Sequence, residues 1–405
     1  MTIIASEAAF GSKLTTMKVL LTGANGYIGK RLLPLLIERG CDVVCAVRDK
    51  ARFPWEGLYA NPKVSVVEID FLKKASVNPD LKDIEAAYYL IHSMGDSDST
   101  GFDKLETTAA MNFVELVSGT SAKQIVYLGG ITNDVNLSTH LASRKKVDEL
   151  LRSGRVPVTS LKAGIIVGSG SSSFEIIRDL VEKLPIMIAP RWVETRTQPI
   201  AIRDVLGYLS GVLLREDTYG GSYDIGGPDV LTYKEMILQY AEVRGLKRRI
   251  ITVPVLTPRL SSYWLYFVTS TSYRLAVNLV NSMKVEVVAK PNDLGRKLGI
   301  QPLNYKEAVR LAFQKIGQKS VASSWKDSFV SSYKTNALSE HLQVPTNGCL
   351  TDERLVPIGT GVDEVVDNIW SIGGGRGWYY ANWLWTIRGL MDKMVGGVGL
   401  RRGRT

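Results

Sequence analysis

The sequence predicts an α/β fold in which a doubly wound parallel sheet carries a smaller lobe and is followed by an incomplete α+β unit. Short apolar runs rich in β-branched residues alternate with helical patterns through the first half of the chain. Such alternation is typical of a parallel sheet with helices on both faces. The pattern changes to loops and shorter elements after about residue 170. Because 405 residues with 45% hydrophobic content can bury a large core, two or three structural units are expected.

The expected elements follow one another in a regular order. Strands are predicted at 18–21, 42–47, 64–69, 86–91, 124–128 and 158–166. Helices are predicted at 29–39, 103–119, 141–153 and 174–183. Beyond them come a strand at 199–202, a helix at 204–214, a strand at 222–225 and a helix at 233–244. This order predicts a sheet domain whose later segments build a lobe beside it.

The domain boundaries are expected where composition changes. Residues 1–16 form a predicted extension, which has one lysine and no long apolar core and so does not resemble a secretory signal. Residues 17–318 form the sheet domain, with its substrate lobe at about 171–198 and 225–318. A polar stretch at 319–347, rich in Ser, Lys and Thr, is predicted to be a linker. Residues 348–405 are the expected C-terminal unit, with a strand predicted at 350–357 and a helix at 362–372.

A turn with glycines at i, i+3 and i+6 separates the first predicted strand from the first predicted helix. Gly23 and Gly26 let the backbone turn sharply and approach a phosphate without Cβ contact, and Gly29 lets the helix pack close to the strand. Free N–H groups and the positive end of the helix dipole then face the anion. This order predicts a site for the pyrophosphate of a dinucleotide, with a merely structural turn as the alternative.

Arg48 closes the second predicted strand, where a dinucleotide fold meets the adenosine ribose. An arginine there binds the 2′-phosphate of NADP, whereas an acidic residue binds the 2′-hydroxyl of NAD. Arg48 therefore favours NADP, whereas the adjacent Asp49 means that NAD is also possible. The alternative for Arg48 is an ordinary solvated charge in a loop. Asp70 and Phe71, after the third strand, are expected to hold and cover the adenine edge. His92, after the fourth strand, is predicted near the inner ribose and nicotinamide, or in an ordinary turn.

Several motifs together resemble a known family. They are Thr22-Gly23-x-x-Gly26-x-x-Gly29, Asp70-Phe71, the helix holding Asn112, and the segments 199–205 and 223–228. This set resembles the extended and atypical short-chain dehydrogenase/reductases, most closely the NmrA-like branch, which includes relatives of a complex I accessory subunit. The resemblance covers about residues 17–318 and implies a Rossmann fold that binds NAD(P). The cofactor contacts it implies are Thr22, Gly23, Asn25, Gly26, Tyr27, Ile28, Gly29, Arg48 and Asp70.

The sequence departs from that family where catalysis is expected. Active members use a tyrosine and a lysine one helical turn apart, so that tyrosine exchanges a proton with the substrate while lysine holds the ribose. Here His140 stands in place of tyrosine, Arg144 in place of lysine, and Thr132 near the place of the usual serine. His140 can donate a proton and Arg144 can hold ribose hydroxyls. The alternative is a cofactor site that is retained without catalytic activity, in which Arg144 binds the dinucleotide and His140 caps the helix.

Two further loops carry polar residues of interest. Residues 168–173 precede a predicted helix and offer N–H donors to a substrate anion, although helix capping explains them as well. Arg191 and Arg196 flank Trp192 and are candidates to line a pocket for an acidic or aromatic substrate. An ordinary basic loop is the alternative.

The C-terminal unit is rich in aromatic residues. Four of the eight tryptophans lie in it, namely Trp370, Trp378, Trp383 and Trp385. In a complete domain such residues are most often core. The segment resembles the opening of a START-like, helix-grip domain, a fold that encloses hydrophobic ligands. A docking tail is the alternative, and exposed aromatics beside Arg401 and Arg402 would also suit peripheral contact with a membrane surface.

Composition narrows the classes of function. Basic residues are scattered despite the net charge of +10, so nucleic-acid binding is not expected. Three cysteines without metal-ligand spacing fit a reduced, cytoplasmic compartment, and three dispersed histidines offer no metal cluster. Two functions stay open: an NADP-preferring reductase of a hydrophobic or quinone-like carbonyl substrate, or a non-catalytic NAD(P)-binding redox sensor or assembly factor.

Overall fold

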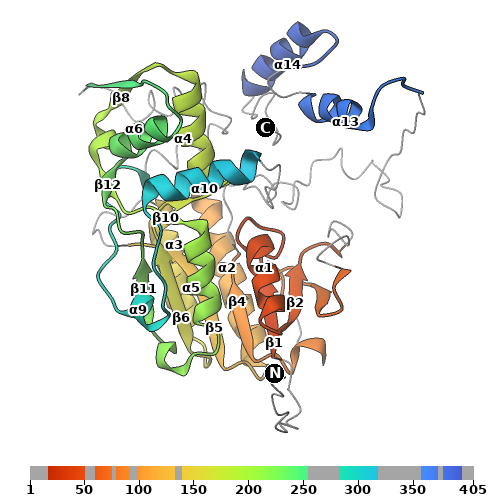
Figure 1. The fold of residues 1–405 in the computed structure, drawn as a ribbon. Coiled ribbons are helices and arrows are strands. Elements are labelled where there is room, and N and C mark those ends of the chain that lie inside the picture. The colour runs from red at the N-terminus through yellow and green to blue at the C-terminus, as the bar shows by residue number, and fades with distance from the viewer. Residues whose placement is uncertain are drawn as a thin grey trace, which may run out of the picture.

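A seven-stranded parallel sheet forms the centre of the computed structural model (Figure 1). The structure describes residues 17–50, 60–74, 79–91, 99–132, 139–253, 282–317, 357–372 and 377–394. The strands are β1 (Lys18–Thr22), β2 (Asp42–Val47), β3 (Val64–Glu68), β4 (Ala86–Tyr89), β5 (Gln124–Gly130), β6 (Val158–Ala163) and β11 (Ser222–Ile225). Their order is β11-β6-β5-β4-β1-β2-β3, and every neighbouring pair is parallel. The predicted α/β class and parallel sheet are confirmed.

Helices cover both faces of this sheet. Alternate residues of β1 enter opposite cores, because successive side chains of a strand point to opposite faces. Val19 and Leu21 join the core beneath α1 (Gly29–Glu38) and α5 (Ile202–Gly211). Leu20 joins the core beneath α2 (Ser99–Ser118) and α3 (Thr139–Arg152). The sheet is therefore doubly wound, and its carboxyl ends form one edge to which the loops after β1, β2, β3, β4 and β5 contribute.

A smaller lobe lies beyond the carboxyl ends of the strands (Figure 1). Its helices α4 (Ser172–Lys183), α6 (Tyr233–Val243) and α10 (Tyr305–Gly317) share one core. The rings of Phe174, Tyr240 and Phe313 meet there with centroid distances of 5.4 to 5.8 Å. Helix α6 begins with a capping box between Thr232 and Glu235.

Short paired strands and turns complete the lobe. The pairs are β7 (Ile166–Val167) with β10 (Ile200–Ala201), β9 (Arg196–Thr197) with β12 (Leu231–Thr232), and β8 (Ile186–Pro190) with β13 (Arg249–Val253). The remaining short elements are η3 (Pro79–Leu81), η4 (Arg191–Glu194), η5 (Glu216–Thr218) and α9 (Leu294–Lys297).

Several predicted elements needed correction. The strand predicted at 158–166 is two strands, β6 and β7, because the chain bends at Gly164 to approach another backbone. A Cβ at Gly164 would lie 2.8 Å from the carbonyl oxygen of Gln198. The helix predicted from 103 begins at Ser99, and the helix predicted at 204–214 is Ile202–Gly211. The pair β8 and β13 and the helix α10 were not predicted.

Two helices are described in the C-terminal unit. Helix α13 (Val362–Ser371) agrees with the helix predicted there, whereas α14 (Asn382–Met394) was not predicted. Most of the strand predicted at 350–357, together with the extension 1–16 and the linker 319–347, lies outside the described residues. Among the helices that the structure describes, none is both long and apolar enough to cross a bilayer.

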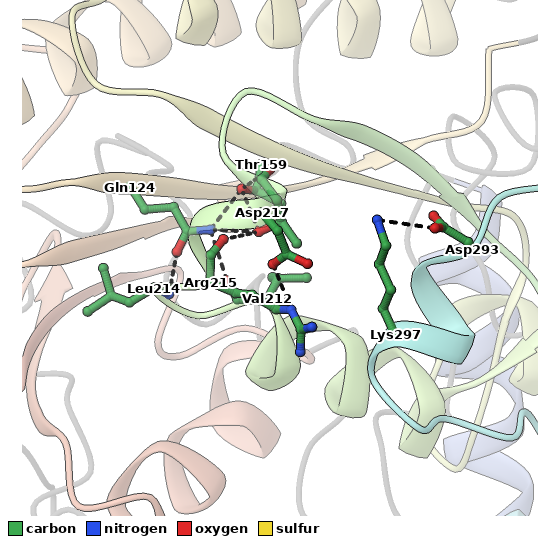
Figure 2. A network of polar contacts seen from close by, with 9 residues as sticks. Gln124, Thr159, Val212, Leu214, Arg215, Asp217, Asp293 and Lys297 are labelled. Carbon is green, nitrogen blue, oxygen red and sulfur yellow. Dashed lines mark hydrogen bonds and ion pairs between the residues drawn. The ribbon is translucent and has the colours of Figure 1, made fainter.

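A buried polar network lies at the amino ends of β5 and β6 (Figure 2). The Gln124 amide nitrogen donates to Thr159 Oγ1 at 2.7 Å and to the Val212 carbonyl at 2.9 Å. Its amide oxygen accepts from the Leu214 N–H at 2.6 Å, and Thr159 Oγ1 donates to the Thr218 carbonyl at 2.9 Å. Because these buried polar groups bond one another, the network stabilises the fold.

Candidate dinucleotide-binding site

The glycine turn between β1 and α1 has no room for side chains at two of its glycines. Gly23 has φ +65°, and a Cβ there would lie 2.6 Å from the Leu90 carbonyl oxygen. A Cβ at Gly29 would lie 2.2 Å from the carbonyl oxygen of Gly23. The Gly26 N–H donates to that same oxygen at 2.8 Å and closes the turn. These contacts give the turn the close backbone packing that the glycine pattern predicts.

Helix α1 begins directly after this turn, so its amino end lies beside the turn. Its N-cap, Ile28, has no side-chain capping bond, and the first turn of the helix carries no acidic residue. The first N–H groups of a helix lack intrahelical partners and, with the helix dipole, favour an anion. In the part of the chain that the structure describes, the buried Oδ1 of Asn25 has no hydrogen-bond partner. A polar group that the protein itself leaves unsatisfied in the turn fits a site that a polar ligand completes.

The side chain of Thr22 makes its hydrogen bonds within the sheet and not in the glycine turn. Its hydroxyl donates to the Tyr88 carbonyl at 2.8 Å and accepts from the Leu90 N–H at 3.0 Å. Thr22 is fully buried, so its hydroxyl ties β1 to β4. Any contact from Thr22 to a cofactor would therefore come from its backbone.

Two predicted adenosine contacts follow β2 and β3. Arg48 is exposed directly after β2. Asp70 follows β3 closely, and its Oδ1 accepts from the Leu72 N–H at 3.1 Å. Phe71 is only 5% exposed and packs on Phe113 at 5.7 Å, so most of its ring belongs to the core. Its role in covering the adenine edge stays a prediction.

Helix α3 is fastened to β5 and α2 at the predicted catalytic place. The Tyr127 hydroxyl donates to the Arg144 carbonyl oxygen at 3.2 Å. The Ser143 hydroxyl donates to the buried Glu106 carboxylate at 2.6 Å. Burial raises the pKa of Tyr127 to about 12, which keeps this phenol neutral near pH 7. These contacts fix the backbone that carries Arg144, and the sequence patterns gave no signal for them.

The structure describes Thr132 and the backbone of His140 among the other predicted site residues. Thr132 follows β5 and is half-buried. His140 is the second residue of α3, whose first residue is Thr139, so its backbone lies inside the helix rather than at the cap. The His140 side chain and the whole of His92 lie outside the described residues.

The loop at 168–173 caps a helix. Ser171 is the N-cap of α4, and its hydroxyl accepts from the Phe174 N–H at 3.3 Å while donating to the Ile166 carbonyl at 2.9 Å. The capping interpretation thus matches these contacts. Arg196 donates two hydrogen bonds of 2.9 and 3.0 Å to Glu286 at the surface, as the basic-loop alternative expects. The described residues hold no group of three or more His, Cys, Asp or Glu side chains suited to a metal ion.

Residues 23–179 match the family model described as NAD(P)H-binding. That span contains the glycine turn and the strands β2 to β7. Residues 347–405 match a second model, described as a protein of unknown function, DUF2867. The chain therefore contains an NAD(P)-binding domain of the Rossmann type, followed by a segment similar to a family without an assigned function.

Solved structures share the fold at low sequence identity. A nucleoside-diphosphate-sugar epimerase from Staphylococcus aureus aligns with a TM-score of 0.58 and 18% identity, over 73% of this chain and 100% of that one. The UDP-glucuronic acid 4-epimerase from Bacillus cereus, in complex with UDP-glucuronic acid and NAD, aligns with a TM-score of 0.56 and 15% identity, over 75% and 100%. Such likeness shows the fold alone.

A curated relative comes from mitochondria. The NADH-ubiquinone oxidoreductase 40 kDa subunit of Neurospora crassa is 21% identical over 238 residues, which are 57% of this chain. The chain spans about 61% of the length of that relative. The similarity agrees with the resemblance to relatives of a complex I accessory subunit.

Proposed function

We propose that this chain is an NAD(P)-dependent oxidoreductase of the atypical short-chain class, which prefers NADPH and reduces a hydrophobic or quinone-like carbonyl compound. The observation that carries the proposal is the glycine turn, where Gly23 and Gly29 leave no room for a Cβ beside the open amino end of α1. The match of residues 23–179 to NAD(P)H-binding domains supports the cofactor class. When bound, the nicotinamide supplies or accepts the hydride.

The preference for NADPH rests on Arg48. It follows β2 at the carboxyl edge of the sheet and is exposed, so its guanidinium is free to reach a 2′-phosphate from the solvent side. Asp70, after the neighbouring strand β3, is proposed to hold the adenine edge. The N–H groups of Tyr27, Ile28 and Gly29, at the start of α1, are proposed to face the pyrophosphate.

The proposed chemistry uses residues at the end of β5 and the start of α3. Arg144 would hold the ribose hydroxyls, since its backbone is fixed by Tyr127. His140, one helical turn earlier, would donate the proton to the carbonyl oxygen of the substrate. Thr132 would polarise that oxygen by a hydrogen bond. Tyr127 is buried and its hydroxyl donates to the Arg144 carbonyl, so we assign it a supporting role rather than a catalytic one.

An equilibrium titration followed by a turnover assay tests this function. We expect NADPH to bind at micromolar concentrations and to be consumed with at least one member of a carbonyl and quinone panel. Failure of both NADPH and NADH to bind would refute the cofactor assignment. His140→Phe should lower turnover while leaving the dissociation constant of NADPH unchanged, and unchanged turnover would remove His140 as the proton donor.

The second candidate is a non-catalytic NAD(P)-binding protein that senses redox state or stabilises an assembly. It is motivated by the sequence 140–144, which has histidine and arginine in place of tyrosine and lysine. NADPH that binds but is never consumed across the panel would favour this candidate over the reductase.

The remaining sequence-based proposals concern the C-terminal unit and the compartment. Large apolar residues of α14 are exposed, among them Trp383, Ile387 and Met394, and they support a role in contacting a hydrophobic surface such as a membrane. The START-like character of 348–405 and the boundaries at 318 and 347 stay predictions. Cytoplasmic location also stays a prediction, since the curated relative is mitochondrial.

A further inference from the structure

Arg31 of α1 reaches across to the turn that begins α4. Its Nη2 donates to the carbonyl oxygen of Ser169 at 2.6 Å. Its guanidinium also lies over the ring of Tyr27, 4.5 Å from the ring centroid. Tyr27 belongs to the glycine turn, and Ser169 lies between β7 and α4. One side chain therefore contacts both the proposed cofactor turn and the entrance to the substrate lobe.

The two turns are packed too closely to move independently. A Cβ added at Gly168 would lie 2.7 Å from the Tyr27 hydroxyl oxygen and 2.5 Å from Cγ2 of Ile202. The Tyr27 hydroxyl is buried, and burial raises the pKa of Tyr27 to about 12 against the opposing effect of the Arg31 charge. The phenol is therefore neutral near pH 7, and its oxygen lies against Gly168 in the turn that precedes α4.

The contacts continue from this junction into α4. Ser171 caps α4 by accepting from the Phe174 N–H. The Gly170 N–H donates to Glu175 Oε1 at 3.0 Å, and Glu175 pairs with Arg178 at 2.6 Å. Local bonds thus order the amino end of α4, and Arg31 of α1 is joined to this segment at the Ser169 carbonyl.

We propose that Tyr27 and Arg31 couple the two halves of the site, so that an anion bound at the glycine turn orders the first turn of α4 and prepares the substrate lobe. Under the proposed function, on which this inference rests, the anion is the pyrophosphate of the dinucleotide. Arg31 is the third residue of α1, so an anion at the helix start attracts its guanidinium and restricts the motion of both side chains. Once these are ordered, ordering residues 168–171 costs less conformational entropy. The coupling is reciprocal, so a ligand on the lobe raises the affinity for the cofactor.

Hydrogen–deuterium exchange of the full chain, with and without saturating NADPH, tests the coupling. In the unaltered protein we expect NADPH to slow exchange both at 23–33 and at 168–180. In Arg31→Met we expect slowing at 23–33 to remain and slowing at 168–180 to fall by about tenfold, equivalent to about 1.4 kcal/mol. Tyr27→Phe, which keeps the ring and removes only the hydroxyl, should show the same loss if Arg31→Met does not fold.

Arg39→Met is the matched control. Arg39 lies just after the other end of α1 and donates in the same way to a neighbouring carbonyl oxygen, that of Ser210. In this control, NADPH should slow exchange at 168–180 as much as it does in the unaltered protein. The coupling is overturned if NADPH slows exchange at 168–180 in Arg31→Met and Tyr27→Phe as much as in the unaltered protein. It is also overturned if NADPH slows exchange only at 23–33 in the unaltered protein. Absence of slowing at both segments refutes the proposed cofactor site and the coupling with it.

Discussion

The Tyr127 hydroxyl donates to the carbonyl oxygen of Arg144 at 3.2 Å and so ties β5 to the helix that carries the proposed ribose-binding arginine. Tyr127→Phe removes this bond alone. We expect it to lower the free energy of unfolding by about 1 kcal/mol and to weaken NADPH binding several-fold, because the backbone of Arg144 loses a support. Urea unfolding and NADPH titration measure the two effects.

Tyr88→Phe is the control for that change. The Tyr88 hydroxyl is also buried and donates to a carbonyl, that of Leu209, at 2.9 Å, but on the opposite face of the sheet. It should cost similar stability and leave the dissociation constant of NADPH unchanged. Equal weakening of NADPH binding by both variants would contradict a role for the Tyr127 bond in the site.

Gly29→Ala should abolish the dinucleotide site. The added methyl would lie 2.2 Å from the Gly23 carbonyl oxygen, so the turn and α1 must move apart. We expect loss of measurable NADPH binding together with about 2 kcal/mol or more of stability, as typical of overpacking. Gly207→Ala in α5 is the control, because its nearest contact would be an ordinary 3.6 Å and alanine favours a helix. NADPH binding that survives Gly29→Ala would remove the turn as the pyrophosphate site.

Arg48→Ala should change cofactor preference. If the guanidinium pairs with the 2′-phosphate, its loss weakens NADPH by about tenfold or more and leaves NADH nearly unchanged. Arg215→Ala removes one surface charge at the opposite, amino edge of the sheet and controls for net charge. Parallel titrations with both cofactors decide the matter, and equal losses for NADPH and NADH would refute the 2′-phosphate role.

Gln124→Leu should destabilise the fold without altering the site. The substitution leaves the Leu214 N–H and the Val212 carbonyl without their side-chain partner in a buried network. We expect a loss of about 1 to 3 kcal/mol in the free energy of unfolding, measured with urea. The affinity for NADPH of the folded fraction should be unchanged, because Gln124 begins β5 and the proposed site lies at its other end. A selective loss of affinity would show that the network supports the site.

The protein should lose stability at alkaline pH. Burial raises the pKa of Cys45, Tyr27 and Tyr127 to about 12, from 9.0 for the thiol and 10.0 for the phenols. Below about pH 9 both folded and unfolded chains keep these protons, so the stabilisation is fully present. Between about pH 9 and 12 the unfolded chain releases them first, and the free energy of unfolding falls. Tyr127→Phe should flatten this fall, and a constant free energy from about pH 8 to 11 would contradict the expectation.

The elements predicted from sequence were those with a strong local pattern. The strand at 42–47 and the helix after Gly29 match β2 and α1 closely, because apolar periodicity and glycine positions act over a few residues. The pairing of β8 with β13 was not predicted, because the two strands are far apart in the chain. No short hairpin turn joins them, so no local sequence pattern indicates that they pair. The packing of Phe71 on Phe113 was also not predicted, because position after a strand does not reveal which way a side chain packs.

The doubly wound sheet and the glycine turn could be predicted from the sequence, because both depend on local backbone freedom and on side-chain periodicity. It also located Arg48 and the substituted pair His140 and Arg144. The contacts around these residues became visible only in the folded chain. The bonds from Tyr127 to Arg144 and from Arg31 to Ser169 join residues 17 and 138 positions apart, and such contacts form only when separate elements pack together.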